Sequence, residues 1–267
     1  MIEKTFYFMG GLPRAGSTVL GAVLNQNPDI YVTPTSPLLN LLEYNEYGWQ
    51  KNPSVIANRY QEQSYNITEA IINGCWEHID RKIILDKCRG WVNYLPSVEF
   101  IFKTKPKMLM PVRDIPSILA SYMRVLRKTE QPWYVDEELI SRGLEINDEN
   151  RVDAIWHLHV KDTLEQFNQV YKGRKDYFLL IEYDELVRKP DLIVERVYDF
   201  LELPKYKHYY FNIENIAKEN DMDAWRIRDL HLVNPELKKT ASHPSEILGK
   251  KVYEKYAMMN LEFWRYK

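Results

Sequence analysis

Two glycines and two hydroxyl residues near the N-terminus have the spacing of an anion-binding loop. Gly11 and Gly16 enclose Leu12-Pro13-Arg14-Ala15, and Ser17-Thr18 follow directly. This is the spacing of a Walker A loop, in which glycines let the backbone approach a phosphate and the next helix offers unpaired N–H groups. The lysine that would reach the terminal phosphates of a nucleoside triphosphate is missing, and Arg14 carries the positive charge instead. The segment predicts a phosphate-type anion site; the alternative is a glycine turn capped by a serine.

A second candidate site combines an arginine with a serine eight positions later. Arg113 follows the apolar run 107–112, and Ser121 lies in the stretch 115–126, which has helical periodicity. Residues i and i+8 share one helix face, so the guanidinium and the hydroxyl are expected to converge on one anion. The alternative is an exposed Arg113–Asp114 pair with a buried serine.

The candidate catalytic groups are Lys87, Arg14 and two carboxylates. Lys87 ends the run Ile83-Ile84-Leu85-Asp86, at the place where α/β sheets present functional groups, although an ion pair with Asp86 is the alternative. Glu43 and Asp86 are candidate general bases, because a closed pocket raises the pKa of a carboxylate toward the useful range. Carboxylates in such positions are more often ordinary charged residues, which is the alternative for both. No metal site is expected, since His157 and His159 fall on different faces of their helix.

Short apolar runs alternate with longer stretches of helical period. Strands are expected over 4–10, 82–86, 107–112 and 177–183, and helices over 17–25, 54–79, 92–102, 115–126, 150–171, 191–201 and 246–258. This alternation predicts βαβ units, and therefore a single P-loop-type α/β domain over 1–267 with a mostly parallel central sheet flanked by helices. Beyond Pro204 the chain is polar and irregular as far as residue 246.

Composition excludes several classes of protein. The 267 residues are 45% hydrophobic and 28% charged, which is globular composition. Lys+Arg number 36 and Asp+Glu 38, a balance of −2, so no polyelectrolyte surface for nucleic acid is expected. No apolar run approaches the length that crosses a bilayer, and we expect a cytoplasmic protein.

Three segments resemble the sulfotransferase family that uses 3′-phosphoadenosine-5′-phosphosulfate (PAPS), particularly the tyrosylprotein and bacterial sulfotransferases. They are Gly10–Thr18 with the following Leu24–Asp29, then Pro111–Tyr122, and Ile181–Pro190. The resemblance implies that Gly11, Pro13, Arg14, Ala15, Gly16, Ser17 and Thr18 hold the 5′-phosphosulfate, that Arg113 and Ser121 hold the 3′-phosphate, and that Tyr183 lies near the nucleotide. It further implies that Lys87 contacts the bridging oxygen, and that Lys238 or Lys239 belongs to a late basic loop that closes over the nucleotide.

The general base does not follow from the resemblance. The tyrosylprotein subgroup has a glutamate shortly after its first helix, whereas the corresponding stretch here, Tyr31–Leu38, holds no carboxylate. Cytosolic relatives use a histidine just after a Lys-Thr pair, whereas Lys87 is followed by Cys88-Arg89. The remaining candidates for the base are therefore Glu43 and Asp86.

The resemblance implies transfer of a sulfuryl group from PAPS to a hydroxyl acceptor, without a metal and with release of 3′,5′-adenosine bisphosphate. The acceptor is left open among small molecules, sugars, lipids and peptides, as is the oligomeric state. A P-loop small-molecule kinase is one alternative, although it lacks the lysine after Gly16. A nucleotide-binding module without catalysis is another. Trp225 is expected to pack in the core, with stacking on adenine as the alternative.

Overall fold

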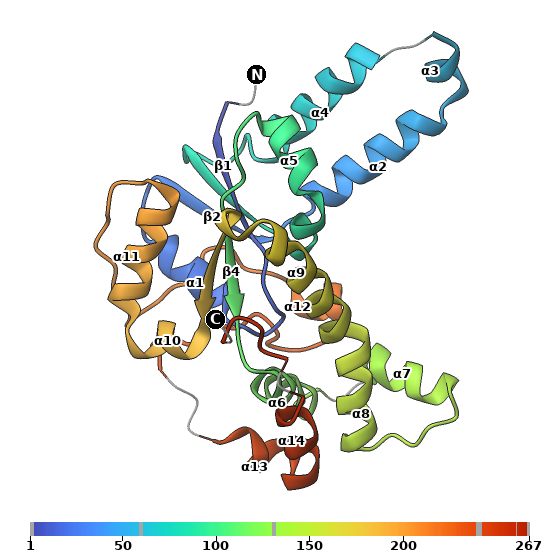
Figure 1. Ribbon diagram of the computed structural model, residues 1–267, viewed down its shortest axis with the longest axis vertical. Helices are drawn as coiled ribbons and strands as arrows, with labels where there is room; N and C mark the ends of the chain where they lie inside the picture. The colour runs from blue at the N-terminus through green and yellow to red at the C-terminus, as the bar shows by residue number, and fades with distance from the viewer. Residues whose placement is uncertain (1–2, 59–60, 130–131, 239–241, 260, 266–267) are drawn as a thin grey trace.

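Five strands form one parallel sheet in the computed structural model, which describes residues 3–58, 61–129, 132–238, 242–259 and 261–265 (Figure 1). The order across the sheet is β2-β3-β1-β4-β5, and all four pairings are parallel. The strands are β1 (Thr5–Met9), β2 (Ile30–Thr35), β3 (Ile83–Lys87), β4 (Met108–Val112) and β5 (Phe178–Glu182). The α/β class and the parallel sheet are confirmed. Because all five strands run in the same direction, their carboxyl ends lie together at one end of the sheet, which we call its carboxyl edge.

Strand β2 is the strand that the sequence analysis did not predict. Pro34 lies within it and removes a backbone donor. The strand tolerates this because it is at the edge of the sheet, beside β3 alone.

Helices cover both faces of the sheet and extend beyond it. The proline in the 92–102 stretch lies in the first turn of α5 and thus begins that helix rather than breaking it, and the long 150–171 stretch contains one π-helical turn. The helices are α1 (Ser17–Leu24), α2 (Leu38–Lys51), α3 (Pro53–Asn58), α4 (Gln61–Cys75), η1 (Arg89–Tyr94), α5 (Leu95–Phe102), α6 (Ile115–Leu126), α7 (Tyr134–Ser141), α8 (Asp148–Ile155), η2 (Trp156–Val160), α9 (Lys161–Gly173), η3 (Lys175–Tyr177), α10 (Tyr183–Arg188), α11 (Pro190–Leu201), α12 (Asp221–Trp225), α13 (Pro244–Leu248) and α14 (Lys250–Ala257).

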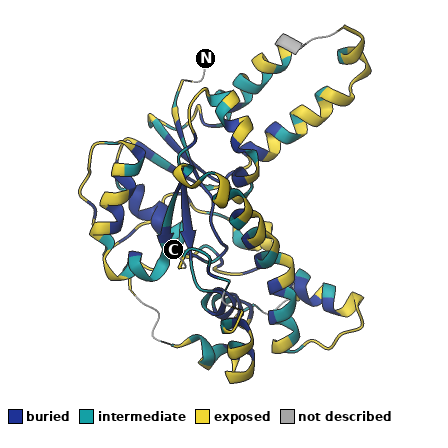
Figure 2. Cartoon of the chain, in the orientation of Figure 1, coloured by how far each residue is buried: buried dark blue, intermediate teal, exposed yellow. Residues whose placement is uncertain are grey.

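Side chains that alternate along the strands build the core on the two faces. Phe6 and Phe8 lie in a cluster with apolar side chains of α2, α4, α5 and α9. Met9, Leu85 and Leu109 lie in a second cluster with α1 and α11. Figure 2 shows the buried residues concentrated on the sheet and the helices beside it, whereas the α2–α4 hairpin projects outward and is largely exposed.

A third cluster lies beyond the carboxyl edge of the sheet. Helices α6, α8 and α14 contribute most of it, together with Ile227 and Leu230 from the irregular segment that follows α12. These two buried side chains hold the irregular segment against the edge where the predicted site residues emerge. Within the described residues, no helix combines the length and apolarity needed to cross a membrane.

Candidate active site

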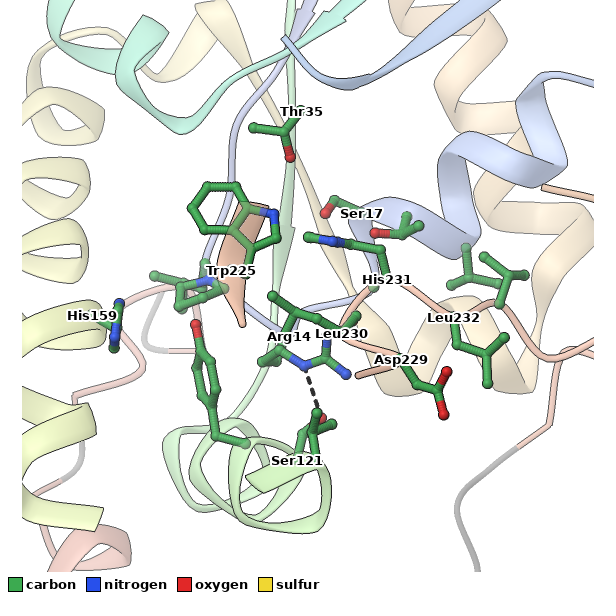
Figure 3. Close-up of a pocket in the computed structure, with 18 of the residues that line it drawn as sticks. Arg14, Ser17, Thr35, Ser121, His159, Trp225, Asp229, Leu230, His231 and Leu232 are labelled. Atoms are coloured by element: carbon green, nitrogen blue, oxygen red, sulfur yellow. Dashed lines mark hydrogen bonds between the residues drawn. The ribbon is translucent and has the colours of Figure 1, made fainter. Parts of the chain in front are cut away.

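A cavity of about 910 Å³ opens at the carboxyl edge of the sheet. Its walls include the loop after β1, Lys87 at the end of β3, Arg113 after β4, and Tyr183 after β5. Figure 3 shows Arg14 and Ser17 from this loop facing the cavity. Among the described residues, the lining holds nine basic side chains (Arg14, Lys87, Arg89, Arg113, Arg124, Lys128, Arg226, Arg228, Lys238) and three acidic ones (Glu137, Asp229, Glu236). A protein with a net charge of −2 thus concentrates positive charge in one hollow, which suits a polyanionic ligand.

The loop after β1 is held in one shape by two glycines. Gly11 has φ +98°, and a Cβ added there would lie 2.5 Å from the Pro111 carbonyl oxygen. Gly16 has φ +93°, and its Cβ would lie 2.5 Å from a ring carbon of Tyr183. Both conformations and both close approaches require glycine. The loop is therefore seated against β4 on one side and against Tyr183 on the other.

The predicted loop residues divide into those that face the cavity and those that support it. Pro13, Arg14, Gly16, Ser17 and Thr18 line the cavity. Gly11 and Ala15 are buried behind it. Helix α1 begins at Ser17, and its N-cap residue is a glycine with no side chain to satisfy the first N–H groups. Those donors, with the positive end of the helix dipole, are available to an anion.

Arg14 links the loop to the opposite wall. Its Nε donates to Ser121 Oγ at 3.2 Å, and its NH1 donates to the Leu230 carbonyl oxygen (Figure 3). Burial lowers the pKa of this guanidinium below its ordinary value. The structure therefore places Arg14 beside the serine expected on the 3′-phosphate, so that one guanidinium lies between the two predicted phosphate sites.

Arg113, which follows β4, and Ser121 on α6 both line this cavity. The Arg113 guanidinium carbon lies 4.3 Å from the centroid of the Tyr183 ring, and its NH1 donates to the Arg14 carbonyl oxygen at 3.3 Å. Its Nε is buried and has no hydrogen-bond partner among the described residues. Asp114 instead caps α6 by accepting from the Ser117 N–H at 2.9 Å. A buried, unpartnered donor next to a basic cavity is the feature that a bound anion would complete.

Lys87 is paired with a carboxylate from a distant part of the chain. Its Nζ lies 3.0 Å from Oε1 of Glu219, and the two side chains are only 10% and 9% exposed. The same Glu219 oxygen accepts the Thr35 N–H at 2.9 Å. Burial acts to raise the pKa of Glu219, but Lys87 and His231 bring it below its ordinary value. Glu219 therefore stays ionised and neutralises Lys87.

The two carboxylates predicted as bases do not line the cavity, which corrects that expectation. Asp86 is fully buried on the face opposite Lys87 and accepts from Ser36 Oγ at 2.6 Å and Trp91 Nε1 at 2.8 Å. Burial raises its pKa to about 6, against those hydrogen bonds. Glu43 accepts from the Tyr94 hydroxyl on the surface of α2. Strand alternation is the reason for Asp86, because consecutive residues point to opposite faces.

The late basic segment reaches the cavity. Lys238 lines the cavity, but it is 65% exposed and pairs with Glu236 at 2.9 Å. Lys239 lies outside the described residues. Trp225 was expected in the core, but it is 39% exposed and lines the cavity. Arg226 and Arg228, in the same stretch, also line it.

Sequence reasoning missed a cluster of three side chains in the irregular segment. Asp221 accepts from His231 twice, from ring Nδ1 at 2.6 Å and from the backbone N–H at 2.8 Å. Glu219 Oε2 lies 3.4 Å from the same ring nitrogen. One side-chain N or O atom from each of Glu219, Asp221 and His231 lies within 4.8 Å of the other two, close enough to bind one cation. We do not assign the cluster to a metal, because its carboxylates already pair with the Lys87 ammonium and accept hydrogen bonds from the two His231 N–H groups.

Comparisons with known proteins identify the family to which this chain belongs. The family model described as "Sulfotransferase family" matches residues 7–208. A Caenorhabditis briggsae protein named as a protein-tyrosine sulfotransferase is 21% identical over 220 residues, or 81% of this chain and 72% of the relative. Protein-tyrosine sulfotransferase A of Caenorhabditis elegans is 23% identical over 208 residues, or 74% of this chain and half of the relative.

Two solved structures share the fold. Mouse sulfotransferase SULT7A1, complexed with PAP, has a TM-score of 0.52 and 13% identity, with coverage of 99% of this chain and 86% of that one. Sulfotransferase STF9 from Mycobacterium avium has a TM-score of 0.50 and 14% identity, with coverage of 98% and 77%. At this identity the likeness establishes the arrangement of sheet and helices.

Proposed function

This chain belongs to the sulfotransferase family, and from that premise we propose which of its residues carry the reaction. The enzyme transfers a sulfuryl group from PAPS to a hydroxyl acceptor and releases 3′,5′-adenosine bisphosphate. The kinase alternative is not favoured, since no lysine follows Gly16 and the family model is that of a sulfotransferase. We further propose that the reaction needs no metal.

The observation that carries the proposal is the position of three cationic groups at the ends of adjacent strands. Lys87 ends β3, Arg14 belongs to the loop after β1, and Arg113 follows β4, and these strands are neighbours in the sheet. All three side chains line one cavity together with the glycine loop, and Arg113 NH1 donates to the Arg14 carbonyl oxygen of that loop at 3.3 Å. A ligand with a phosphosulfate at its 5′ position and a phosphate at its 3′ position carries the negative charge that these three cations would neutralise.

The residues of this chain have separate roles in the reaction. When bound, PAPS supplies the activated sulfuryl group and a leaving oxygen on the 5′-phosphate. Ser17, Thr18 and the first N–H groups of α1 hold the equatorial oxygens, and Arg113 with Ser121 holds the 3′-phosphate. The Lys87 ammonium leaves Glu219 and contacts the oxygen that bridges the 5′-phosphate and the sulfuryl group. There it neutralises the negative charge that develops as the sulfuryl group leaves. A fixed cation at that point lowers the barrier because charge on the leaving oxygen is greatest in the transition state.

We place the acceptor against an aromatic wall of the same cavity. Trp133 and His159 are stacked with ring centroids 5.1 Å apart and planes 8° apart, and Tyr122 stacks on His159 at 5.6 Å. In Figure 3, His159 and Leu232 lie on opposite sides of the cavity with Arg14 between them. Flat faces of this kind favour a planar hydroxyl compound such as a phenol. The curated relatives named as protein-tyrosine sulfotransferases support the same class.

The decisive experiment measures transfer from sulfur-labelled PAPS to a panel of tyrosine peptides, sugars, lipids and simple alcohols. Labelled ATP in place of PAPS is the control for a kinase. A parallel thermal shift compares 3′,5′-adenosine bisphosphate with ADP and 5′-AMP. Stabilisation by the bisphosphate no greater than by 5′-AMP would contradict the 3′-phosphate site.

Lys87→Ala tests the electrophilic role separately. We expect turnover to fall by roughly 100-fold or more, while the affinity for the bisphosphate changes several-fold at most, because the contact strengthens in the transition state. The exposed Lys172→Ala on α9 is the control. Unchanged turnover in Lys87→Ala would remove this residue from the mechanism.

A further inference from the structure

His231 has the surroundings of a general base, although it belongs to an irregular segment that is far in sequence from the base positions implied by the family resemblance. It lines the cavity together with Lys87 and the loop residues. Figure 3 shows its ring extending into the cavity near that of Trp225. The centroids of the two rings are 6.4 Å apart. Its side chain is 18% exposed, so it is sheltered but still reachable from the cavity.

Asp221 fixes both the direction and the tautomer of this imidazole. One carboxylate oxygen accepts from ring Nδ1 at 2.6 Å, and the other accepts from the His231 backbone N–H at 2.8 Å. A carboxylate acceptor at Nδ1 keeps the proton on that nitrogen and leaves the lone pair on Nε2. Nε2 has no hydrogen-bond partner among the described residues, so its lone pair is available.

We propose that His231 is the general base that takes the proton of the acceptor hydroxyl, with Asp221 as its positioning residue. The proposal rests on the proposed sulfuryl transfer and supplies the base that the sequence left open. The acceptor O–H bond breaks as its proton passes to Nε2, and the acceptor oxygen forms the new O–S bond. The S–O bond to the 5′-phosphate breaks, and its electron pair remains on the phosphate oxygen next to Lys87. His231 then returns the proton to solvent.

The groups that face His231 agree with this role. Burial lowers the pKa of His231, against the carboxylates of Glu219 and Asp221, while the Lys87 ammonium also lowers it. The ring is therefore neutral at neutral pH and able to accept a proton. Glu219 is the nearest competitor for the role, but its Oε1 already accepts from Lys87 and the Thr35 N–H, which keeps it anionic and weakly basic.

The first test uses His231→Asn, which removes the ring while it retains an amide to face Asp221. With PAPS and the best acceptor of the panel described above, kcat is expected to fall by roughly 100-fold or more, the usual contribution of a general base. Binding of 3′,5′-adenosine bisphosphate by calorimetry is expected to stay within about threefold, since the base contacts the acceptor. The exposed His78→Asn is the matched control.

The second test follows protonation rather than turnover. Nitrogen NMR of the imidazole is expected to show the Nδ1–H tautomer in the wild type, and Asp221→Asn is expected to lose that preference and a smaller share of kcat. The wild-type profile of kcat/KM against pH has an acidic limb below pH 6.5 because protonated His231 is no base. Glu219→Gln keeps this limb but moves it to lower pH, because the Glu219 carboxylate raises the pKa of His231.

Each contrary result has a distinct meaning. A His231→Asn enzyme with kcat within threefold of wild type, or an Nε2–H tautomer in the wild type, overturns the assignment of His231 and leaves the sulfotransferase function intact. Loss of the acidic limb in Glu219→Gln assigns the base to Glu219 instead. Activity that disappears with a chelator and returns with a divalent ion would make the cluster a metal site. No transfer from PAPS to any acceptor by the wild type is the failure of the proposed function itself.

Discussion

Arg113→Ala should weaken binding of 3′,5′-adenosine bisphosphate far more than binding of 5′-AMP. The guanidinium is held 4.3 Å over the Tyr183 ring, and its buried Nε has no partner among the described residues. A 3′-phosphate would accept charge-assisted hydrogen bonds from this group, each contributing about 1.5–3 kcal/mol. The expected loss is about 3 kcal/mol, or roughly a 100-fold rise in Kd. For 5′-AMP, which lacks that phosphate, the change should stay within about threefold.

Isothermal titration calorimetry on the two ligands measures this difference directly. Arg113→Lys keeps the charge but loses the planar fork, so its loss should be intermediate. Arg188→Ala on α10, where the side chain is 69% exposed, is the matched control. Arg113 also donates to the Arg14 carbonyl oxygen at 3.3 Å, so its removal has a second possible effect on the loop backbone. Equal losses for both ligands would show that this structural effect dominates and would refute the 3′-phosphate role.

Three further changes test the loop and the buried titrating groups. Gly16 has φ +93°, and Gly16→Ala places a Cβ 2.5 Å from the Tyr183 ring. The free energy of unfolding measured in urea should therefore fall by about 1–3 kcal/mol. Gly48→Ala, with open space around its Cβ, should show no loss. Burial lowers the pKa of His159 to about 4, so between about pH 6.5 and 4 the unfolded chain is protonated at this residue while the folded chain is not. The free energy of unfolding of the wild type should therefore fall by about 3 kcal/mol relative to His159→Phe as the pH falls through that range. Parallel curves of unfolding free energy against pH for the two proteins would contradict this. Burial raises the pKa of Asp86 to about 6, so here stability is lost as the pH rises. The free energy of unfolding of the wild type should fall by up to about 3 kcal/mol relative to Asp86→Asn between pH 3.8 and 6. A stability difference between the two proteins that does not change with pH would argue against a desolvated carboxylate.

The phosphate loop shows how far local sequence reaches. Gly11 and Gly16 need positive φ angles and a close approach to β4 and Tyr183, and their spacing is a property of consecutive residues. The same is true of the helix that carries Ser121 eight positions after Arg113. Four of the five strands follow from apolar runs, whereas β2 is interrupted by Pro34 and becomes a strand through its pairing with β3. The parallel class follows from alternation of strands and helices.

Tertiary structure decided which charged groups face one another. Asp86 and Lys87 are adjacent in sequence, yet the alternation of β3 buries one on the far face and directs the other toward the cavity. The partner of Lys87 is Glu219, 132 residues later, and the Asp221–His231 pair reaches the same place from a segment without periodicity. Periodicity and spacing are local signals, whereas the approach of an irregular segment to the sheet edge depends on the burial of Ile227 and Leu230 against α6 and its neighbours. The sequence by itself therefore determined the fold class, the glycine loop and the spacing of the residues predicted to bind the two phosphates, and only packing over long sequence separations decided which groups surround Lys87.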